Sequence, residues 1–152
     1  MIRSSRFGLP CLAALLAGCA LEPGSSYVAQ LQQPADAEIL ADGIAGFVAI
    51  RLPAASSTVE LDPTPSDQAG NSLTPALTAA LRRRGFAVAE DGQPVSVGVH
   101  HLRYLVTTLD NGNLVRLTLD DGAEGSRFFV RNTTGELQPG GPFMVTQTEA
   151  AP

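Results

Sequence analysis

The sequence predicts an α+β fold, with two helices packed on one face of a mostly antiparallel sheet. Two segments in the first 85 residues carry apolar residues at the spacing of one helix face. From Pro94 onward, apolar and polar residues instead alternate, and short turn sequences interrupt the alternation. The resulting order of helix, strand, helix and a run of strands is typical of this class.

Length and composition describe one domain with a hydrophobic core. The chain has 152 residues, of which 44% are hydrophobic and 16% are charged, so it is too apolar to remain disordered. Its net charge is −5, and its ten basic residues form no basic stripe. An acidic surface repels phosphates, which argues against direct nucleic-acid binding.

The amino terminus has the layout of an export signal. Arg3 and Arg6 form a short positive segment, and an apolar run from Phe7 to Leu21 follows. That run is too short to span a bilayer core, which needs about 20 apolar residues. It contains Leu16-Ala17-Gly18-Cys19, which resembles the bacterial lipobox. Residues 1–18 are therefore predicted to be a lipoprotein signal peptide.

The lipobox resemblance implies cleavage before Cys19, a diacylglycerol on its sulfur and an acyl chain such as palmitate on its new amine. Two or more acyl chains anchor a protein stably, whereas one chain does so only marginally. Ala20, not Asp, follows Cys19, a pattern that in Gram-negative lipoproteins implies sorting to the outer membrane, here at its periplasmic face. The alternatives are an ordinary signal peptide with an incidental Cys19, and a short membrane anchor.

The mature chain is predicted to consist of a tether, one domain and a tail. Residues 19–35 comprise the lipidated Cys19 and a stretch of Gly, Ser, Gln and Pro without periodicity, which indicates a flexible tether. Residues 36–147 are expected to form a single periplasmic α+β domain. Residues 148–152 are expected to be a disordered tail.

Asp36 is expected to open the first helix and Pro53 to end it. Gly43 and Gly46 lower its helix propensity, but they would allow close packing against a sheet. The apolar face of this helix consists of Ile39, Leu40, Ile44, Phe47, Val48 and Leu52. The alternating segment from Ser57 to Pro63 then predicts a strand.

The second helix has stronger boundary signals. Thr74 is expected to cap it, with Pro75 at its first position. Arg82 to Arg84 occupy the last turn, where cations favour the negative end of the helix dipole, and Gly85 supplies the stop. Its buried face consists of Leu73, Leu77, Ala80 and Leu81. A strand is expected to begin at Phe86.

Asn111-Gly112 predicts the turn of a central hairpin. If these two residues form the loop, Tyr104 lies opposite Leu119, and Val106 lies opposite Leu117. This register places apolar residues on one face of the hairpin.

Two further strands are expected, from Ser126 to Asn132 and from Phe143 to Gln147. Their edges are candidate docking sites, because unpaired backbone groups invite strand addition by a partner. The side chains of Phe128, Val130 and Phe143 are expected to be core residues.

The adjacent His100 and His101 are the only histidines, and the alternation of the strand changes phase at this pair, which predicts a β-bulge or bend. Neighbouring strand residues point to opposite faces, so the pair cannot bind one metal without that bulge. Either imidazole could sense pH, but a partly buried structural role is preferred. The sequence has no HExxH or EF-hand spacing, and no metal site is predicted.

No catalytic residue is predicted. The sequence contains no GxSxG motif. Its acidic pairs, Glu90-Asp91 and Asp120-Asp121, flank glycines as turn residues do. Gly140-Gly141-Pro142 lacks the strand-to-helix context of a phosphate loop. We therefore expect a protein that is not an enzyme and needs no cofactor.

Several segments occur in an order that resembles one protein family. They are a lipobox, a helix ending near "RLP", "STVELDP", "LTPALTAALRRRGFAV", "LRYLV", "SRFFV" and "GELQPGGPF". This order is similar to the conjugal transfer lipoproteins called TrbH. The resemblance implies an outer-membrane accessory subunit of a mating-pair type IV secretion system, in contact with other subunits of that complex. It carries over no catalytic residue, and only Cys19 is matched through a motif.

Two other classes of function remain as alternatives. Small periplasmic α+β modules with a helix–Gly–Phe–x–Val element also bind partner strands or loops, which would make this protein a generic envelope adaptor or pilot lipoprotein unrelated to conjugation. A cell-wall hydrolase is the enzymatic alternative. Neighbouring genes for a mating-pair ATPase and pilin would support transfer, and activity on peptidoglycan would support the hydrolase.

Overall fold

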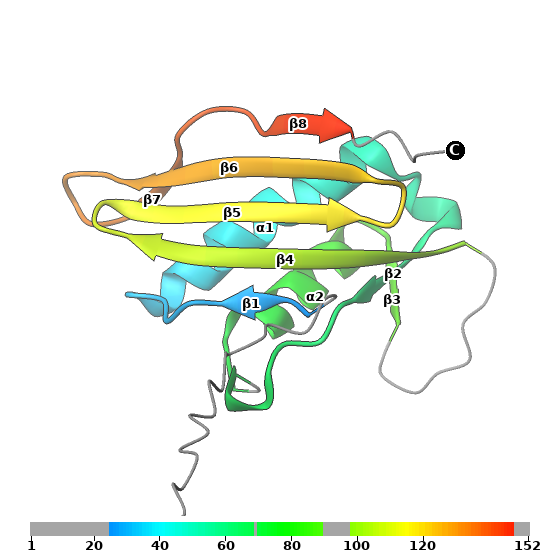
Figure 1. Cartoon of the computed structure of the whole chain (residues 1–152), viewed down its shortest axis with the longest axis horizontal. Coiled ribbons are helices and arrows are strands. Elements are labelled where there is room, and N and C mark those ends of the chain that lie inside the picture. The colour runs from blue at the N-terminus through cyan, green and yellow to red at the C-terminus, as the bar shows by residue number, and fades with distance from the viewer. Residues whose placement is uncertain (1–24, 69, 90–97, 148–152) are drawn as a thin grey trace, which may run out of the picture.

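Three long strands form the centre of the sheet in the computed structural model, which describes residues 25–68, 70–89 and 98–147. They are β4 (Val99–Leu109), β5 (Gly112–Leu119) and β6 (Ala123–Arg131), and they run antiparallel to one another. Two helices, α1 (Pro34–Arg51) and α2 (Leu73–Arg83), cover one face of this sheet (Figure 1). The predicted α+β class, with both helices on one face, is confirmed.

Short strands flank this centre on both sides. Strand β2 (Thr58–Leu61) pairs with the first half of β4, and β1 (Tyr27–Val28) pairs with the second half of β4. Strand β3 (Ala87–Ala89) pairs with β2. These three pairings are parallel. Along β6, β8 (Met144–Gln147) pairs with its first half and β7 (Leu137–Pro139) with its end, both antiparallel. The described residues thus form one mixed, mostly antiparallel sheet of eight strands. Short 3₁₀ turns at Ala54–Ser56 and Ser66–Gln68 join the elements on the β2 side.

The core lies between the helices and the sheet. Alternate residues of β4 and β5 face inward because strand side chains alternate, and they meet the apolar faces of both helices. The largest fully buried side chains are Tyr104, Phe129, Leu40, Ile44, Leu73, Leu77, Leu81, Leu102, Leu117, Leu119, Val48 and Val59. No helix within the described ranges is both long and apolar enough to cross a membrane.

Two glycines bring α1 close to the sheet. A Cβ atom on Gly43 of α1 would lie 2.6 Å from the ring of Phe129, and one on Gly125 of β6 would lie 2.6 Å from the ring of Phe47. The predicted role of Gly43 in close packing is therefore confirmed. Gly46 has no such role, because its Cβ would meet only the Arg84 side chain, at 3.7 Å.

The central hairpin forms at the predicted place, but its predicted register is wrong. Leu109 pairs with Gly112, so the loop residues are Asp110 and Asn111, and Tyr104 faces Leu117, not Leu119. A type I′ turn needs positive φ at both loop residues, and no non-glycine residue in the described ranges has positive φ. The two-residue shift keeps the same side chains on the inner face, because the side-chain period of a strand is two.

Val106 accordingly faces Val115, not Leu117, on the inner face. Gly112 enters β5 instead of the loop for a steric reason: a Cβ at this position would clash with the carbonyl oxygen of Phe129 on β6. This close approach of two backbones, which involves a neighbouring strand, determines where the loop ends.

The segment predicted as a flexible tether is partly wrong, because its residues from Ser25 onward belong to the domain. Ser26 donates its backbone N–H to the Pro63 carbonyl at 2.9 Å and accepts the Tyr104 N–H on its hydroxyl at 3.2 Å. Val28 is buried, and β1 pairs with β4. Helix α1 begins at Pro34, two residues before the predicted start at Asp36.

The start of α1 is tied to the end of β6 by a buried ion pair. The Asp36 carboxylate, 1% exposed, accepts hydrogen bonds from the Arg131 guanidinium at 2.8 and 3.2 Å and from the Gln33 N–H at 3.0 Å. Arg131 also donates to the Gly135 carbonyl at 2.6 Å. The hydrogen bond from Arg131 to Asp36 raises the pKa of Arg131 above its ordinary value; burial opposes this shift, and the negative charge of Asp36 adds to it.

The start of α2 also differs from its prediction. The helix begins at Leu73, and Thr74 lies inside it. The side-chain oxygen of Asn71 accepts hydrogen bonds from the Thr74 N–H at 2.9 Å and from its hydroxyl at 3.0 Å. Asn71 therefore takes the role that was predicted for Thr74. The predicted stop is confirmed at Gly85, which has a φ of +88°.

Two further expectations about strands are wrong. The register between β2 and β4 continues without interruption through His100 and His101, so β4 has no bulge there. The residues before Gly98 in the predicted phase change lie outside the described ranges. On β6 the buried phenylalanine is Phe129, and Phe128 and Val130 are half-buried because they point to the opposite face.

Candidate functional site

Cys19, the only predicted site residue, lies outside the described residues, and its lipidation stays a prediction. Phe143 was expected to be a core residue. Instead its side chain is half-buried and packs against the edge of the core, where its ring centre lies 4.9 Å from that of Phe47. The described residues contain two other regions that could have a function, which are a histidine and carboxylate cluster and an open groove.

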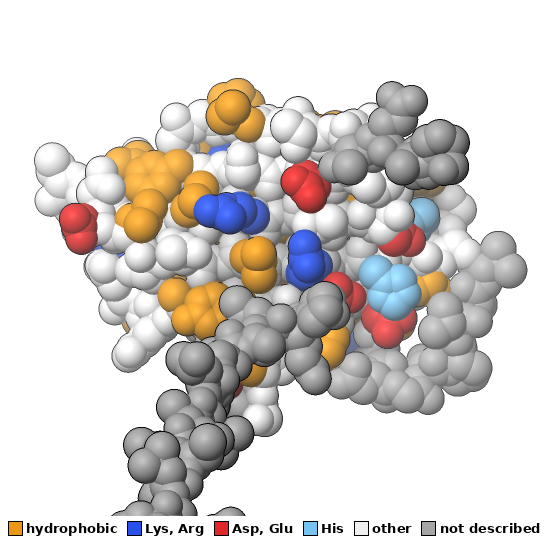
Figure 2. Space-filling model, viewed as in Figure 1, with side chains coloured by type: hydrophobic (Ala, Val, Ile, Leu, Met, Phe, Trp, Pro, Cys, Tyr) orange, Lys and Arg blue, Asp and Glu red, His pale blue; other side chains and the backbone are white. Residues whose placement is uncertain are grey.

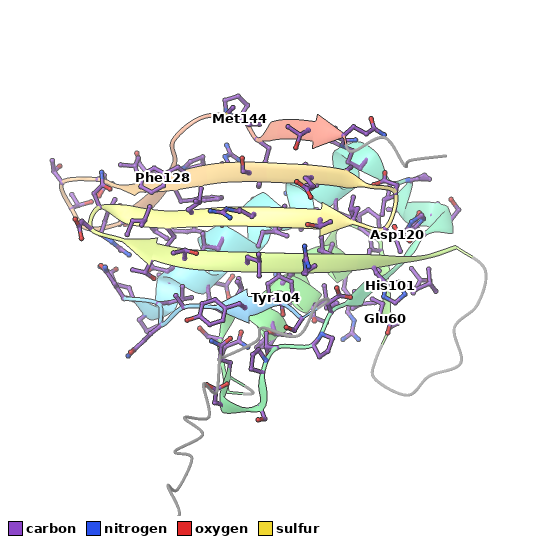
Figure 3. All side chains as sticks on the ribbon, viewed as in Figure 1. Glu60, His101, Tyr104, Asp120, Phe128 and Met144 are labelled. Atoms are coloured by element: carbon purple, nitrogen blue, oxygen red, sulfur yellow. The ribbon has the colours of Figure 1, made fainter. Side chains whose placement is uncertain are left out.

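The histidine and carboxylate cluster lies at the start of β4 (Figure 3). His101 lies 3.5 Å from a carboxylate oxygen of Asp62 and 3.9 Å from one of Glu60, both on the β2 side. His100 contacts Asp120 instead, at 3.2 Å. The two imidazoles therefore pair with separate carboxylates.

This cluster has the features of a solvated charge network. Figure 2 shows the histidine side chains beside several acidic side chains at one end of the molecule, on the right of the view. Burial raises the pKa of Asp62 above its ordinary value of 3.8, and the nearby His101 opposes that shift. No group of three or more potential ligands in the described ranges has metal-binding geometry. The His100 and His101 side chains are 29% and 53% exposed, and ion pairs with such access to solvent contribute little to stability.

The second region is an open groove between α1 and the edge of the sheet at β8, which we call the α1–β8 groove. Its volume is about 960 Å³. The walls are mainly apolar, and Ile50 on the outer side of α1 is 87% exposed. The groove is lined by Glu38, Ile39, Asp42, Gly43, Gly46, Phe47, Ala49, Ile50, Arg51, Arg84, Arg127, Phe129, Pro139, Pro142, Phe143 and Val145.

Arg127 on β6 contributes a guanidinium group to the groove. Its guanidinium carbon lies 5.3 Å from the ring centre of Phe129 and 5.1 Å from that of Phe143, within cation–π distance. Its Nε atom is buried without a hydrogen-bond partner. Within the described ranges no acidic group forms an ion pair with Arg127. An arginine in this state retains donors that a carboxylate could accept from.

The other charges of the groove differ in their pairing. Arg84 forms an ion pair with Asp42 at 2.9 Å. Arg51 lies over the ring of Phe47, at 5.6 Å. With Arg127 and Glu38 included, the lining carries three arginines and two carboxylates. The groove therefore has a small positive charge on a chain whose net charge is −5.

Strand β8 forms one wall of the groove and an edge of the sheet. Within the described residues it pairs only with β6. Every residue of β8 is exposed, with Met144 at 76% and Val145 at 46% (Figure 3 shows Met144 at the outer edge). Val145 pairs with Gly125, whose missing side chain faces Phe47, so Val145 points toward the groove and Met144 away from it.

Sequence reasoning located β8 as a candidate docking edge but did not identify the groove. The available signal was in α1, where Ala49 and Ile50 add exposed apolar residues outside the predicted buried face. A helix that is apolar around most of its circumference is expected to have a second contact surface. Arg127 could not be identified, because its aromatic neighbours come from separate parts of the chain.

Comparison with known proteins gives one family. The model of a family described as conjugal transfer protein TrbH matches residues 22–149. This interval contains every element from β1 to β8. No curated protein and no solved structure matches the chain significantly.

Proposed function

Because the chain belongs to the conjugal transfer protein TrbH family, we propose that it is a non-catalytic accessory subunit of a mating-pair type IV secretion apparatus. In this proposal a lipid on Cys19 anchors it to the periplasmic face of the outer membrane. The folded domain then contacts other envelope subunits of the apparatus.

The family match over residues 22–149 carries this proposal. The match begins just after Cys19, so the part of the chain that belongs to the family is the part that cleavage at the lipobox would leave on the membrane. The lipobox resemblance of Leu16 to Cys19 supports the anchor. The positive segment before it supports export.

The surface chemistry supports contact with proteins in preference to the transferred DNA. A chain with a net charge of −5 repels phosphates. The α1–β8 groove, in contrast, combines apolar walls with a strand edge that no other strand of the described residues pairs with, and these are features of peptide-binding surfaces.

Gene deletion in a donor strain tests the role in transfer. We expect a lower mating frequency in the deletion strain and recovery with the wild-type gene. Unchanged transfer, with no redundant copy present, would contradict the role in conjugation and leave the generic envelope adaptor.

Metabolic labelling with a fatty-acid probe tests the anchor separately. Cys19→Ser should abolish labelling and shift the protein out of the outer-membrane fraction. Cys11→Ser is the matched control, because Cys11 lies within the predicted signal peptide and its loss should leave labelling intact. Retained labelling in Cys19→Ser would refute the assignment of the lipid to this residue.

A further inference from the structure

We propose that the α1–β8 groove binds an extended, apolar segment of another protein, which adds as a strand to β8 and places a carboxylate against Arg127. The statement that this other protein is a subunit of the transfer apparatus rests on the proposed function. The chemistry of the segment is argued from the groove alone.

The backbone of β8 determines the conformation of the segment. An edge strand offers a row of unpaired N–H and C=O groups, and an extended chain can satisfy them by continuing the sheet. Within the described ranges no other strand occupies the outer side of β8. Its four residues, Met144–Gln147, are all exposed.

The direction of Val145 determines which side chains of the segment are recognised. Side chains of an added strand alternate between the two faces of the sheet. Those on the face of Val145 would lie along the groove, near the exposed Ile50 and the ring of Phe143. Apolar residues at alternate positions of the segment therefore match this wall.

The charge of the segment follows from Arg127. Its guanidinium carbon lies within cation–π distance of the rings of Phe129 and Phe143, and its Nε atom is buried without a hydrogen-bond partner. A carboxylate accepts charge-assisted hydrogen bonds from a guanidinium more strongly than a neutral group does. One Asp or Glu among the groove-facing residues of the segment would supply an ion-pair partner for the guanidinium.

Photocrosslinking of the full-length lipoprotein in donor cells tests the location. The photoreactive residue p-benzoylphenylalanine is placed at Val145, which faces the groove, or at Thr146, which is the next residue and points to the opposite face. We expect an adduct at Val145 at least about tenfold stronger than at Thr146, with the crosslinked peptide identified by mass spectrometry. Equal adducts, or an adduct with a second copy of this chain or with lipid, would overturn the proposal.

A synthetic peptide with the crosslinked sequence then tests the chemistry. A version of the peptide in which the carboxylate is replaced by an amide should bind wild-type protein at least about tenfold more weakly. Arg127→Met should lower the affinity for the acidic peptide by a similar factor and leave the affinity for the amide version unchanged. Arg116→Met, at an exposed position on β5, is the control and should have no effect. Slower hydrogen exchange of the β8 amides in the complex should accompany binding.

The peptide comparison uses wild-type protein, so it stays decisive even if Arg127→Met does not fold. Equal binding of the acidic and amide peptides, or unchanged exchange in β8, would overturn the proposal. A confirmed segment in a strain whose mating frequency does not depend on this gene would overturn the proposed function only. Reduced mating without a groove adduct would overturn the groove proposal only.

Discussion

The contact between α1 and the sheet depends on Gly43, and this dependence can be measured with a matched pair of substitutions. Gly43→Ala and Gly46→Ala make the same change three residues apart in one helix. Alanine is more favourable than glycine in a helix interior by about 1 kcal/mol, and this gain is common to both positions. Any difference in stability between the variants therefore reports packing.

The structure predicts opposite outcomes for the two positions. A Cβ at Gly43 would lie 2.6 Å from the end of the Phe129 ring, whereas carbon atoms in contact are normally about 3.5–4.0 Å apart. The ring is fully buried, so it must move against packed neighbours, at a cost of about 1–3 kcal/mol. A Cβ at Gly46 meets only the Arg84 side chain, at 3.7 Å.

We therefore expect Gly46→Ala to raise the free energy of unfolding by about 1 kcal/mol. Gly43→Ala should have a free energy of unfolding about 2 kcal/mol below that of Gly46→Ala. Urea denaturation measures both, and the slope with denaturant should stay unchanged. Equal midpoints for the two variants would refute the argument that Gly43 is required by the Phe129 ring.

Three further predictions concern other parts of the fold. Gly112→Val should lower the free energy of unfolding by more than about 1 kcal/mol, because its Cβ would clash with the Phe129 carbonyl; urea denaturation would show an unchanged midpoint if this clash were absent. Asp36→Asn should lower the free energy of unfolding by about 3 kcal/mol, because it leaves the buried charge of Arg131 without its ion-pair partner. A loss no larger than that of a substitution at an exposed position would contradict this role. Burial raises the pKa of Asp62 above 3.8, so the native state binds its proton more tightly than the unfolded state does. The stabilising contribution of protonated Asp62 is thus complete below pH 3.8 and is lost as pH rises through the native pKa. Asp62→Asn should therefore raise the melting temperature at pH 7 but not at pH 3. A higher melting temperature at pH 3 but not at pH 7 would refute a raised pKa of Asp62.

The elements could be predicted from the sequence because periodicity reports burial directly. Leu77 and Leu81 repeat at helical spacing and are fully buried on α2, and Tyr104 and Val106 alternate and are fully buried on β4. The stop of α2 at Gly85 could be predicted for a local reason as well, because glycine accepts positive φ without strain.

The errors arose where a distant part of the chain decides the local structure. The loop of the central hairpin ends before Gly112 because Phe129 on the next strand requires the space of its missing side chain. Ser26 is ordered because it bonds to Pro63 and to Tyr104. The groove has the same origin, since Arg127 and Phe143 meet only after β8 has returned to β6. No pattern of residues that are close in sequence predicts such contacts.

Because the chain joins the folded domain already at Ser26, a lipid on Cys19 would hold the domain close to the membrane. Only residues 20–24 separate Cys19 from the first described residue, so an anchor at Cys19 would hold Ser25 within about 20 Å of the lipid. Ser26 enters beside β4, whereas β8 lies beyond β6 on the other side of the sheet. Four strand spacings of about 4.8 Å separate β1 from β8. A tether this short would keep the β1 edge closer to the lipid attachment point than the α1–β8 groove on the opposite side of the sheet.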